Sequence, residues 1–544
     1  MLTRIHLIAT AALLTPWAVV AQHQTATFDP PIVGGELPYT IEIREISLAP
    51  AIVPNIHSTA AADWNGQWVF LAGRTNGLHG MTGRNAFDPA FENREVWVID
   101  PKSKQSWHKS LETSAASGLT QDQIDALSAV NTQFYQDSTH WFIVGGYGYK
   151  RSVADHKTYN TLTKIDLPGL VDWVKAPAGT ETTLAADHID QIQDSYFQVT
   201  GGGLERIGSE FQLVFGQNYD GRYRTNFNGT YTKQIRRFTV DLSNGLSVPA
   251  VSKIATTQRD DFRRRDLNIT TLLNRTAIGT YQENVAALSG VFTPDDGAWT
   301  VPVVVEPGGQ VTSSGALGLE QGFQIYHCAK TGLYHRATGE MHVLLFGGIT
   351  ILEYDDSSDS WTSDSQAPFT NQCGTVIRRP DGTFDQYFLP ARFPLILSDG
   401  KELRFGANAE FFINRDVPSL HPRVIDLTSI QEPTIIGHIF GGLVADAGNS
   451  GNTGSSGHIF EVSLTPNLPT VEIRIARISN EVSIEWESEL NTSYIVERSI
   501  DLKEWVEVSL SIDGTGTTLQ WQESRADPAY FYRVLAGKVS KPAQ

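Results

Sequence analysis

The chain has 544 residues, of which 60 are Asp or Glu and 42 are Lys or Arg, so its formal net charge is −18. This acidic balance argues against nucleic acid or an anionic membrane as a partner. With 40% apolar and 19% charged residues, the chain is too apolar for intrinsic disorder and too poor in charge for a coiled coil. The 47 Gly, 25 Pro, 12 Trp and 17 Tyr residues favour many short strands and tight turns, which predicts an all-β fold.

Residues 1–21 have the pattern of a secretory signal peptide. One basic residue, Arg4, precedes an apolar stretch from Ile5 to Val20, and the small residue Ala21 comes next. The stretch is short for a membrane anchor and is interrupted by polar residues, and no later segment is apolar enough to span a bilayer. We therefore expect cleavage after Ala21 and a mature protein that is secreted, periplasmic or on the cell surface.

Two cysteines, Cys328 and Cys373, are present after the signal sequence. An oxidising compartment permits a disulfide between them, which would close a loop of roughly 45 residues. The alternative is a pair of buried thiols that pack as small apolar side chains. Neither cysteine belongs to a CxxC or CxxH pair, so no metal site is predicted.

One pattern recurs along the chain: an apolar run that ends in a glycine-containing turn. The distances between the last glycines of successive copies are 73, 70, 74, 58 and 94 residues. Such distances suit four strands with generous loops in each copy. The turns end at Gly73, Gly146, Gly216, Gly348 and Gly442, with a weaker copy at Gly290.

A second pattern comes after three of these turns, in which a strand ends in Asp and a Trp comes six or seven residues later. The pairs are Asp100 with Trp107, Asp166 with Trp173, and Asp355 with Trp361. We interpret the Trp as an apolar plate that fills the space between adjacent sheets. The paired glycines are interpreted as positions where a neighbouring sheet approaches the backbone closely.

At these residues the chain resembles the kelch family of β-propellers, whose repeat has four apolar residues, Gly-Gly, and later an aromatic residue and a spaced Trp. The best matches are Gly145-Gly146 with Trp173, and Gly347-Gly348 with Trp361. The resemblance covers about residues 55 to 465. It implies a kelch-like propeller at residues 22–466. The number of glycine turns predicts six blades, with seven as the nearest alternative.

Propellers usually close their ring by letting one terminus complete the blade of the other, which removes an exposed sheet edge. The early segment Tyr39–Ile46 is the candidate strand, and we expect it to pair beside His458–Leu464. A short helix is also predicted, because Thr120 and Gln123 form a capping box before apolar residues on one helical face.

After Pro466 and Pro469 the sequence changes to six short strands with alternating apolar residues. This rhythm predicts a small β-sandwich at residues 470–544. The segments Tyr494–Ser499, Asp501–Trp505 and Phe531–Val534 resemble the fibronectin-type-III-like modules at the C-termini of exported proteins of environmental Gram-negative bacteria. The resemblance implies a Gram-negative bacterial origin and a role in attachment, spacing or sorting.

The loops after the first three glycine turns are rich in Arg and Tyr. In a propeller these loops gather on one face, around the central channel. Arg and Tyr together recognise carboxylates and sugar rings through bidentate hydrogen bonds and stacking. We therefore predict a ligand-binding face with seven candidate residues: Arg74, His79, Tyr147, Tyr149, Arg151, Tyr219 and Arg222.

The pairs Tyr326-His327 and Tyr334-His335 invite comparison with galactose oxidase, a copper enzyme on a kelch-like propeller. In that family a crosslinked Cys lies well upstream of the Tyr-His pair. Here no Cys precedes Cys328, so this radical chemistry is not predicted and neither metal nor cofactor is expected. A His beside Tyr in a strand is more typical of packing or solvent contact.

No Gly-x-Ser-x-Gly or His-Glu-x-x-His motif occurs in the chain. The favoured hypothesis is a secreted, non-catalytic kelch-like propeller that binds a ligand through its loop face. That ligand would be a carbohydrate, a small anion or a protein partner. The alternative is a propeller enzyme of the mutarotase, epimerase or oxidase type that acts on sugars or sugar acids, because kelch-like propellers include a sialic acid mutarotase. The oligomeric state is left open.

Overall fold

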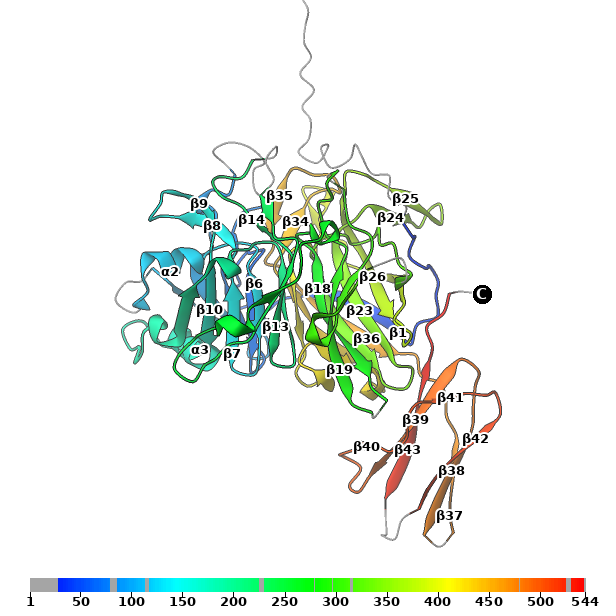
Figure 1. The fold of residues 1–544 in the computed structure, drawn as a ribbon. Coiled ribbons are helices and arrows are strands. Elements are labelled where there is room, and N and C mark those ends of the chain that lie inside the picture. The colour runs from blue at the N-terminus through cyan, green and yellow to red at the C-terminus, as the bar shows by residue number, and fades with distance from the viewer. Residues whose placement is uncertain are drawn as a thin grey trace, which may run out of the picture.

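The computed structural model describes residues 28–78, 86–112, 117–224, 229–277, 279–295, 297–313, 317–478, 480–524 and 530–542. It is all-β, with 48% strand and 8% helix, which confirms the predicted class (Figure 1). The predicted signal peptide, residues 1–21, lies outside the described residues. No helix within these ranges is long and apolar enough to cross a membrane.

The main body contains six larger sheets, each built around four antiparallel strands. The first three are β2 (Ala60–Trp64), β3 (Gln67–Leu71), β4 (Glu95–Asp100) and β5 (Gln105–Ser110); β6 (Gln133–Gln136), β7 (His140–Val144), β10 (Thr161–Asp166) and β11 (Ile189–Gln193); and β12 (Gly203–Ile207), β13 (Glu210–Val214), β16 (Ile235–Phe238) and β17 (Ile254–Ala255).

The next three sheets have the same order, and the last of them takes its fourth strand from the N-terminus. They are β18 (Asn268–Arg275), β19 (Tyr281–Leu288), β20 (Val303–Val305) and β21 (Val311–Thr312); β22 (Ala329–His335), β23 (Glu340–Ile349), β26 (Phe369–Arg378) and β27 (Phe384–Arg392); and β30 (Glu410–Ile413), β33 (Thr434–Phe440), β36 (Ile459–Pro466) and β1 (Tyr39–Ile46). The fifth sheet is extended by β32 (Val424–Asp426) and β31 (Ser419–His421), which lie beyond β22.

The first strands of the six sheets are neighbours in chain order, because β2 contacts β6, β6 contacts β12, and so on to β22 and β30. The sixth sheet in turn packs against the first. Phe412 of β30 stacks on Trp68 of β3, with ring centroids 4.9 Å apart, and Phe440 of β33 packs on Phe70 at the same distance. The six sheets therefore form a continuous series whose end meets its beginning.

Strand β1 pairs antiparallel with β36 along its whole length, from Tyr39 opposite Pro466 to Ile46 opposite Ile459 (Figure 1). This confirms the predicted pairing of the N-terminal strand. Ile43 is buried against the core of the fifth and sixth sheets, and the Tyr39 hydroxyl lies 3.1 Å from Nδ1 of His342. The N-terminal strand is therefore held by side chains as well as by its backbone.

Five of the six predicted glycine turns, including the weaker copy at Gly290, lie between the second and third strands of one sheet, and Gly348 lies near the end of the second strand β23. Four of these connections carry a hairpin: β8 (Tyr147–Lys150) with β9 (Asp155–Thr158), β14 (Gln217–Asn218) with β15 (Thr230–Tyr231), β24 (Leu352–Asp355) with β25 (Ser360–Ser363), and β34 (Leu443–Ala445) with β35 (Thr453–Ser455). Gly145 has φ +59°, and a Cβ there would lie 2.0 Å from the carbonyl oxygen of Val199. The close approach expected at the glycines is therefore present.

The Asp–Trp pattern does not mark equivalent structures. Trp107 lies in β5 and Trp361 in the hairpin strand β25, but Trp173 lies in helix α3 (Leu167–Lys175). Asp166 caps this helix by accepting a hydrogen bond from the Gly169 amide at 3.1 Å. Trp173 still packs between the first two sheets, so its packing role holds although its backbone is helical.

The predicted short helix is α2 (Gln121–Ala126), and both hydrogen bonds of the capping box between Thr120 and Gln123 are formed. Residues 473–538 form a second unit of two sheets that share one apolar core. The first sheet is β37 (Ile473–Ile478), β38 (Glu481–Glu487) and β42 (Thr518–Ser524). The second is β39 (Thr492–Ser499), β40 (Val506–Glu507), β41 (Ile512–Asp513) and β43 (Phe531–Lys538).

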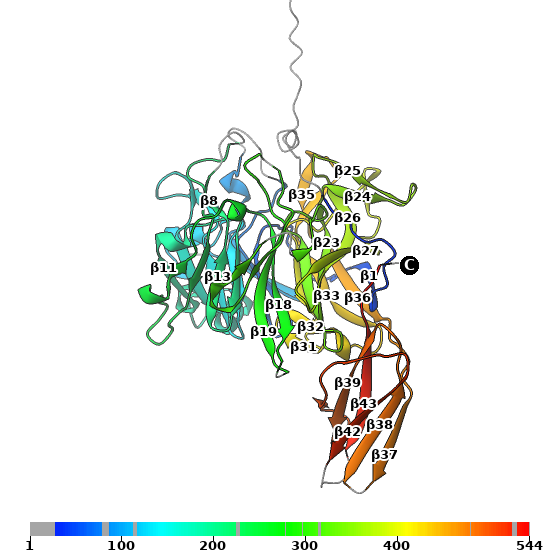
Figure 2. The same cartoon turned by 45° about the vertical axis from the view of Figure 1, so that its right-hand side comes forward.

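This second unit, which we call the C-terminal module, lies against one end of the main body near β31 and β32 (Figure 2). The backbones of Glu36 and Lys541 pair with each other, and the Ser540 amide and hydroxyl donate to the buried carboxylate of Glu340. At the β22–β23 turn, Nη1 of Arg336 lies 2.5 Å from Oε1 of Glu497. The module is thus bound to the body by buried polar contacts and does not hang from a free linker.

We expect Ile43→Ala to destabilise the main body as a whole, because Ile43 is buried where β1 completes the sixth sheet. Removing such a side chain costs about 2–4 kcal/mol of unfolding free energy. Thermal unfolding followed by circular dichroism measures the change. The matched control is Glu42→Ala, which alters the exposed neighbour in the same strand. Equal melting temperatures for the two variants would show that β1 does not stabilise the body.

Candidate functional site

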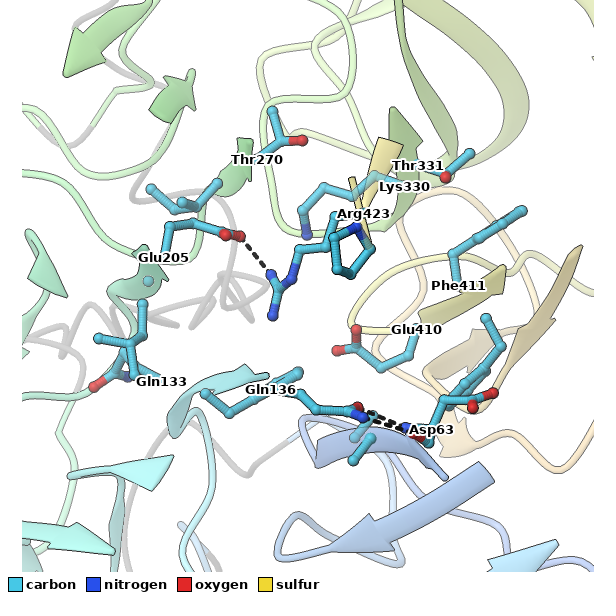
Figure 3. Close-up of a pocket in the computed structure, with 18 of the residues that line it drawn as sticks. Asp63, Gln133, Gln136, Glu205, Thr270, Lys330, Thr331, Glu410, Phe411 and Arg423 are labelled. Atoms are coloured by element: carbon cyan, nitrogen blue, oxygen red, sulfur yellow. Dashed lines mark hydrogen bonds and ion pairs between the residues drawn. The ribbon is translucent and has the colours of Figure 1, made fainter. Parts of the chain in front are cut away.

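One cavity of about 760 Å³ lies where the first strands of the six sheets meet. Every first strand contributes to its wall: β2, β6, β12, β18, β22 and β30. Charged side chains from three of these strands, together with Arg423 from the β31–β32 turn, point into a common space (Figure 3). We call this space the central channel.

Lys330 and Glu410 are the two charged residues of the central channel whose burial is least offset by polar partners. Lys330 lies in β22 and Glu410 in β30, and these first strands are neighbours. Within the described ranges, neither side chain has a hydrogen bond, and Lys330 has no ion pair. Burial raises the pKa of Glu410 to about 7, although the positive charges of Lys330 and Arg423 oppose the shift. Burial lowers the pKa of Lys330, and the charge of Glu410 opposes that shift.

His327 lies beside Glu410, just before the start of β22. Its Nε2 is 4.0 Å from Oε1 of Glu410, and its backbone N–H donates to the carbonyl of Asp266 at 3.0 Å. Burial lowers the pKa of His327 well below its ordinary value, so the imidazole is neutral at physiological pH. The channel therefore places a neutral imidazole beside a carboxyl group that titrates near neutrality. A small movement of either side chain would bring the two groups to hydrogen-bond distance.

A second pair of charges lies across the channel. Nη1 of Arg423 is 2.5 Å from Oε1 of Glu205 in β12, whose other oxygen accepts a hydrogen bond from Thr271 at 3.1 Å (Figure 3). The guanidinium also lies over the ring of Tyr135, 4.9 Å from its centroid. Burial raises the pKa of Glu205, and the neighbouring Arg423 opposes this shift. Glu205 thus orients Arg423, which still faces the cavity.

Three of the sequence-predicted residues meet in one buried cluster outside the channel. The ring centroids of Tyr147 and Tyr219 are 5.6 Å apart, and both lie in an apolar cluster with Phe87 and Tyr223. Arg74 lies over the Phe87 ring at 5.5 Å and donates to the carbonyl of Asp88 at 3.1 Å. These side chains join the loops of the first three sheets to each other.

Arg151 is engaged with two acidic residues of the same face. Its Nη1 lies 2.6 Å from Oδ1 of Asp125 and 3.5 Å from Oε2 of Glu92, and both carboxylates are buried. The Tyr149 amide donates to Glu92 at 2.9 Å. The charge of Arg151 on the predicted ligand-binding face is therefore compensated by neighbouring carboxylates.

The remaining two predicted residues are Arg222 and His79. Arg222 lies in the β14–β15 connection that also contains Tyr219, and His79 falls outside the described residues. A ligand-binding role of the seven loop residues stays a prediction.

The two cysteines are both free and buried. Burial raises the pKa of the Cys328 thiol to about 11 and the pKa of the Cys373 thiol to about 12. Of the two alternatives left open by the sequence, the structure has the pair of buried thiols and not the disulfide.

The sequence patterns do not indicate Lys330, Glu410, Glu205 or Arg423, and they indicate His327 only as a packing residue. A usable signal for Lys330 and Glu205 is a charged residue inside the strand that precedes an apolar strand of the glycine pattern. Lys330 precedes Glu340–Ile349, and Glu205 precedes Glu210–Val214. Nothing local indicates Arg423, because its turn reaches the channel from a connection between two other strands.

No protein-family model matches the chain, and no curated protein matches it. Among solved structures, one described as the structure of YjhT aligns with a TM-score of 0.40 and 9% sequence identity, covering 77% of this chain and 100% of that chain. A likeness of this size supports no conclusion about function. A functional assignment must therefore come from the geometry of the central channel.

We expect Glu410→Gln to stabilise the protein more at pH 8 than at pH 5. Glu410 ionises near pH 4.5 when unfolded and near pH 7 when folded, so its contribution to stability falls as pH rises between these values. The Gln variant does not lose stability in this way. For a side chain that is 17% exposed, we expect the unsubstituted protein to lose about 1–3 kcal/mol of unfolding free energy over this pH range. Chemical denaturation of both proteins at several pH values measures the difference. A difference that does not vary with pH would contradict the raised pKa.

Proposed function

We propose that the protein is a secreted, kelch-like β-propeller of six blades whose central channel binds a small anionic, polyhydroxylated ligand such as a sugar acid. The six successive sheets, the contact of the sixth with the first, and the cavity lined by all first strands support the propeller. In this proposal β1 completes the sixth blade. Residues 22–466 then form the propeller.

Lys330 is the observation that carries the ligand assignment. Among the described residues it has no ion pair, so this cation in the channel wall loses hydration without gaining a partner, and an anionic ligand would supply one. Arg423 adds a second cation that faces the same cavity. This combination fits a carboxylate on a hydroxylated ring. The wall also offers neutral hydrogen-bonding groups and an apolar surface: Gln136, Thr270, Asn408 and Phe411.

The ligand is assigned to the channel and not to the loop face because of how the loop residues are used. Tyr147 and Tyr219 pack on each other and in one cluster with Phe87, and Arg74 lies over that Phe87 ring. Arg151 is paired with buried carboxylates. Binding there would require these internal contacts to be broken. An anion could bind Lys330 without breaking an ion pair of that residue within the described ranges.

The C-terminal module is proposed to be a fibronectin-type-III-like sandwich that attaches or sorts the exported protein. Its two sheets around a common core support the sandwich. The sequence pattern of residues 1–21 supports export, with a secreted, periplasmic or cell-surface location in a Gram-negative bacterium.

A second candidate function is acid–base catalysis on the same ligand. The 4.0 Å separation of His327 and Glu410, with a Glu410 pKa of about 7, favours it, because such a pair can accept a proton from one ligand atom and donate one to another. Nuclear magnetic resonance with a sugar acid would show faster exchange between its anomers if this holds. Glu410→Gln would then bind the sugar acid without accelerating the exchange.

We expect D-glucuronate, used as a probe, to bind more tightly at pH 6 than at pH 8, by about threefold to tenfold. As pH falls through about 7, Glu410 takes up a proton and its negative charge no longer repels an anion in the channel, so the anion gains affinity. Lys330→Met should weaken binding by roughly tenfold or more, the value of one hydrogen bond to a charged group. Isothermal titration calorimetry measures both effects.

The controls for this titration are D-glucose, which lacks the carboxylate, and Lys102→Met, which removes an exposed lysine. Glu410→Gln should bind glucuronate with little dependence on pH, because it has no proton to exchange. Equal binding by Lys330→Met and Lys102→Met would overturn the channel assignment. Equal binding of glucose and glucuronate would overturn the anionic ligand class.

A further inference from the structure

Arg423 reaches the channel from a hairpin inserted between two strands of the sixth sheet. The hairpin β31–β32 lies in the connection from β30 to β33, and β32 pairs in parallel with β22 of the fifth sheet, with Val424 opposite Gly332. Arg423 occupies the turn between β31 and β32, and its amide donates to Nδ1 of His421 at 3.2 Å. The position of the Arg423 side chain therefore depends on where this hairpin lies.

The hairpin is fastened at the end of β32 by a buried ion pair. Asp426, the last residue of β32, accepts from Nε of Arg336, with Oδ1 at 3.1 Å and Oδ2 at 3.0 Å. The Arg336 amide also donates to Thr428 just beyond the strand, at 2.7 Å. The side chains of Arg336 and Asp426 are 9% and 7% exposed, so water replaces little of this contact.

The other end of the Arg336 guanidinium is held by the C-terminal module. Nη1 lies 2.5 Å from Oε1 of Glu497 in β39 and 3.2 Å from Oε2 of Glu507 in β40. Glu497 is itself held by Arg533 of β43 at 2.7 Å. A planar guanidinium that is bound on both edges has a single orientation.

We propose that the C-terminal module positions Arg423 in the central channel, acting through Glu497, Arg336 and Asp426 on the β31–β32 hairpin. Arg336 and Asp426 are thus positioning residues for the ligand site, and the module serves the channel as well as any attachment role. This inference rests on the proposed function in one respect: Arg423 matters only where the channel binds a ligand.

Removing the module's carboxylates should loosen the hairpin and withdraw Arg423 without unfolding the main body. Glu497 and Glu507 neutralise Arg336, so their loss leaves Asp426 as its one carboxylate partner among the described residues and lets the guanidinium turn toward solvent. Asp426 then loses its cationic donor and keeps the hydrogen bonds from the Ser429 hydroxyl and the Thr428 amide. The charge of Arg423 opposes the raised pKa of Glu410, so its withdrawal should raise that pKa further.

The test uses the full chain with Glu497→Ala and Glu507→Ala together. The control pair is Glu481→Ala and Glu487→Ala, which removes two exposed carboxylates from β38 of the same module. Hydrogen exchange followed by mass spectrometry reports on residues 419–426. We expect exchange there to be roughly tenfold faster in the test variant and unchanged in the control, a factor that corresponds to about 1.4 kcal/mol of local opening.

Two further readouts separate positioning from general loosening. Glucuronate affinity should fall about threefold to tenfold, and the pH midpoint of glucuronate binding should move to higher pH, which a change in stability alone would not produce. If residues 473–538 also exchange faster, Asp426→Asn cuts the same connection from the body side and should reproduce the effect at residues 419–426.

Unchanged exchange at residues 419–426 in both variants would overturn the inference, whatever the channel binds. Faster exchange together with an unmoved pH midpoint would also overturn it, because the hairpin would then not control Arg423. If the wild-type protein bound no glucuronate, the proposed ligand class would fail. The exchange measurement would still decide whether the module holds the hairpin.

Discussion

The pairing of β1 with β36 is the contact on which the arrangement of the main body depends. It supplies the fourth strand of the sixth sheet from residues that precede the first sheet, so the two ends of the series are joined by backbone hydrogen bonds in full register. The sixth sheet is then complete and packs Phe412 against Trp68 of the first. An unpaired sixth sheet would expose both an edge and an apolar face. The central channel exists because all six first strands are held around it.

The charges of the central channel are placed at a cost in stability. The protein is acidic overall, yet Lys330 and Arg423 face the same enclosed space, and of these two only Arg423 has a close carboxylate partner among the described residues. Burial opposes ionisation of Lys330 and Glu410 alike. Apolar residues of similar size would pack in these positions without that cost. Binding of a ligand best explains why charged groups are buried at this cost without an internal partner.

The loop face and the channel use similar residues for different purposes. In the loops, arginines meet buried carboxylates at short distance, as Arg151 does with Asp125, and tyrosines pack on each other. These contacts are like those of a core, and they hold successive loops in place. In the channel, the distance between His327 and Glu410 is longer, at 4.0 Å. The C-terminal module acts on the channel and not on the loops, because its Glu497 ends a chain of contacts that reaches the hairpin of Arg423.

The sequence by itself determined the all-β class, the six glycine turns, the pairing of the N-terminal strand and the capped helix α2. The turns and the helix depend on local chemistry: glycine is required where φ is positive and a backbone passes close by, as at Gly145, and a capping box forms within four residues. The Asp166–Trp173 pair shows the limit of such reasoning, because an Asp before Leu-Pro-Gly can end a strand and cap a helix at once.

Only the tertiary structure decided which polar residues form the candidate site. Lys330, Glu410 and Glu205 lie in three different sheets, and whether a strand residue faces the channel depends on the register and tilt of its sheet. Arg423 enters from a crossing hairpin whose position is set by parallel pairing with β22 and by the ion pair of Asp426. Conversely, the loop tyrosines pack on each other and Arg151 pairs with Asp125, because a loop that closes on its neighbour buries the same side chains that a free loop would present to a ligand.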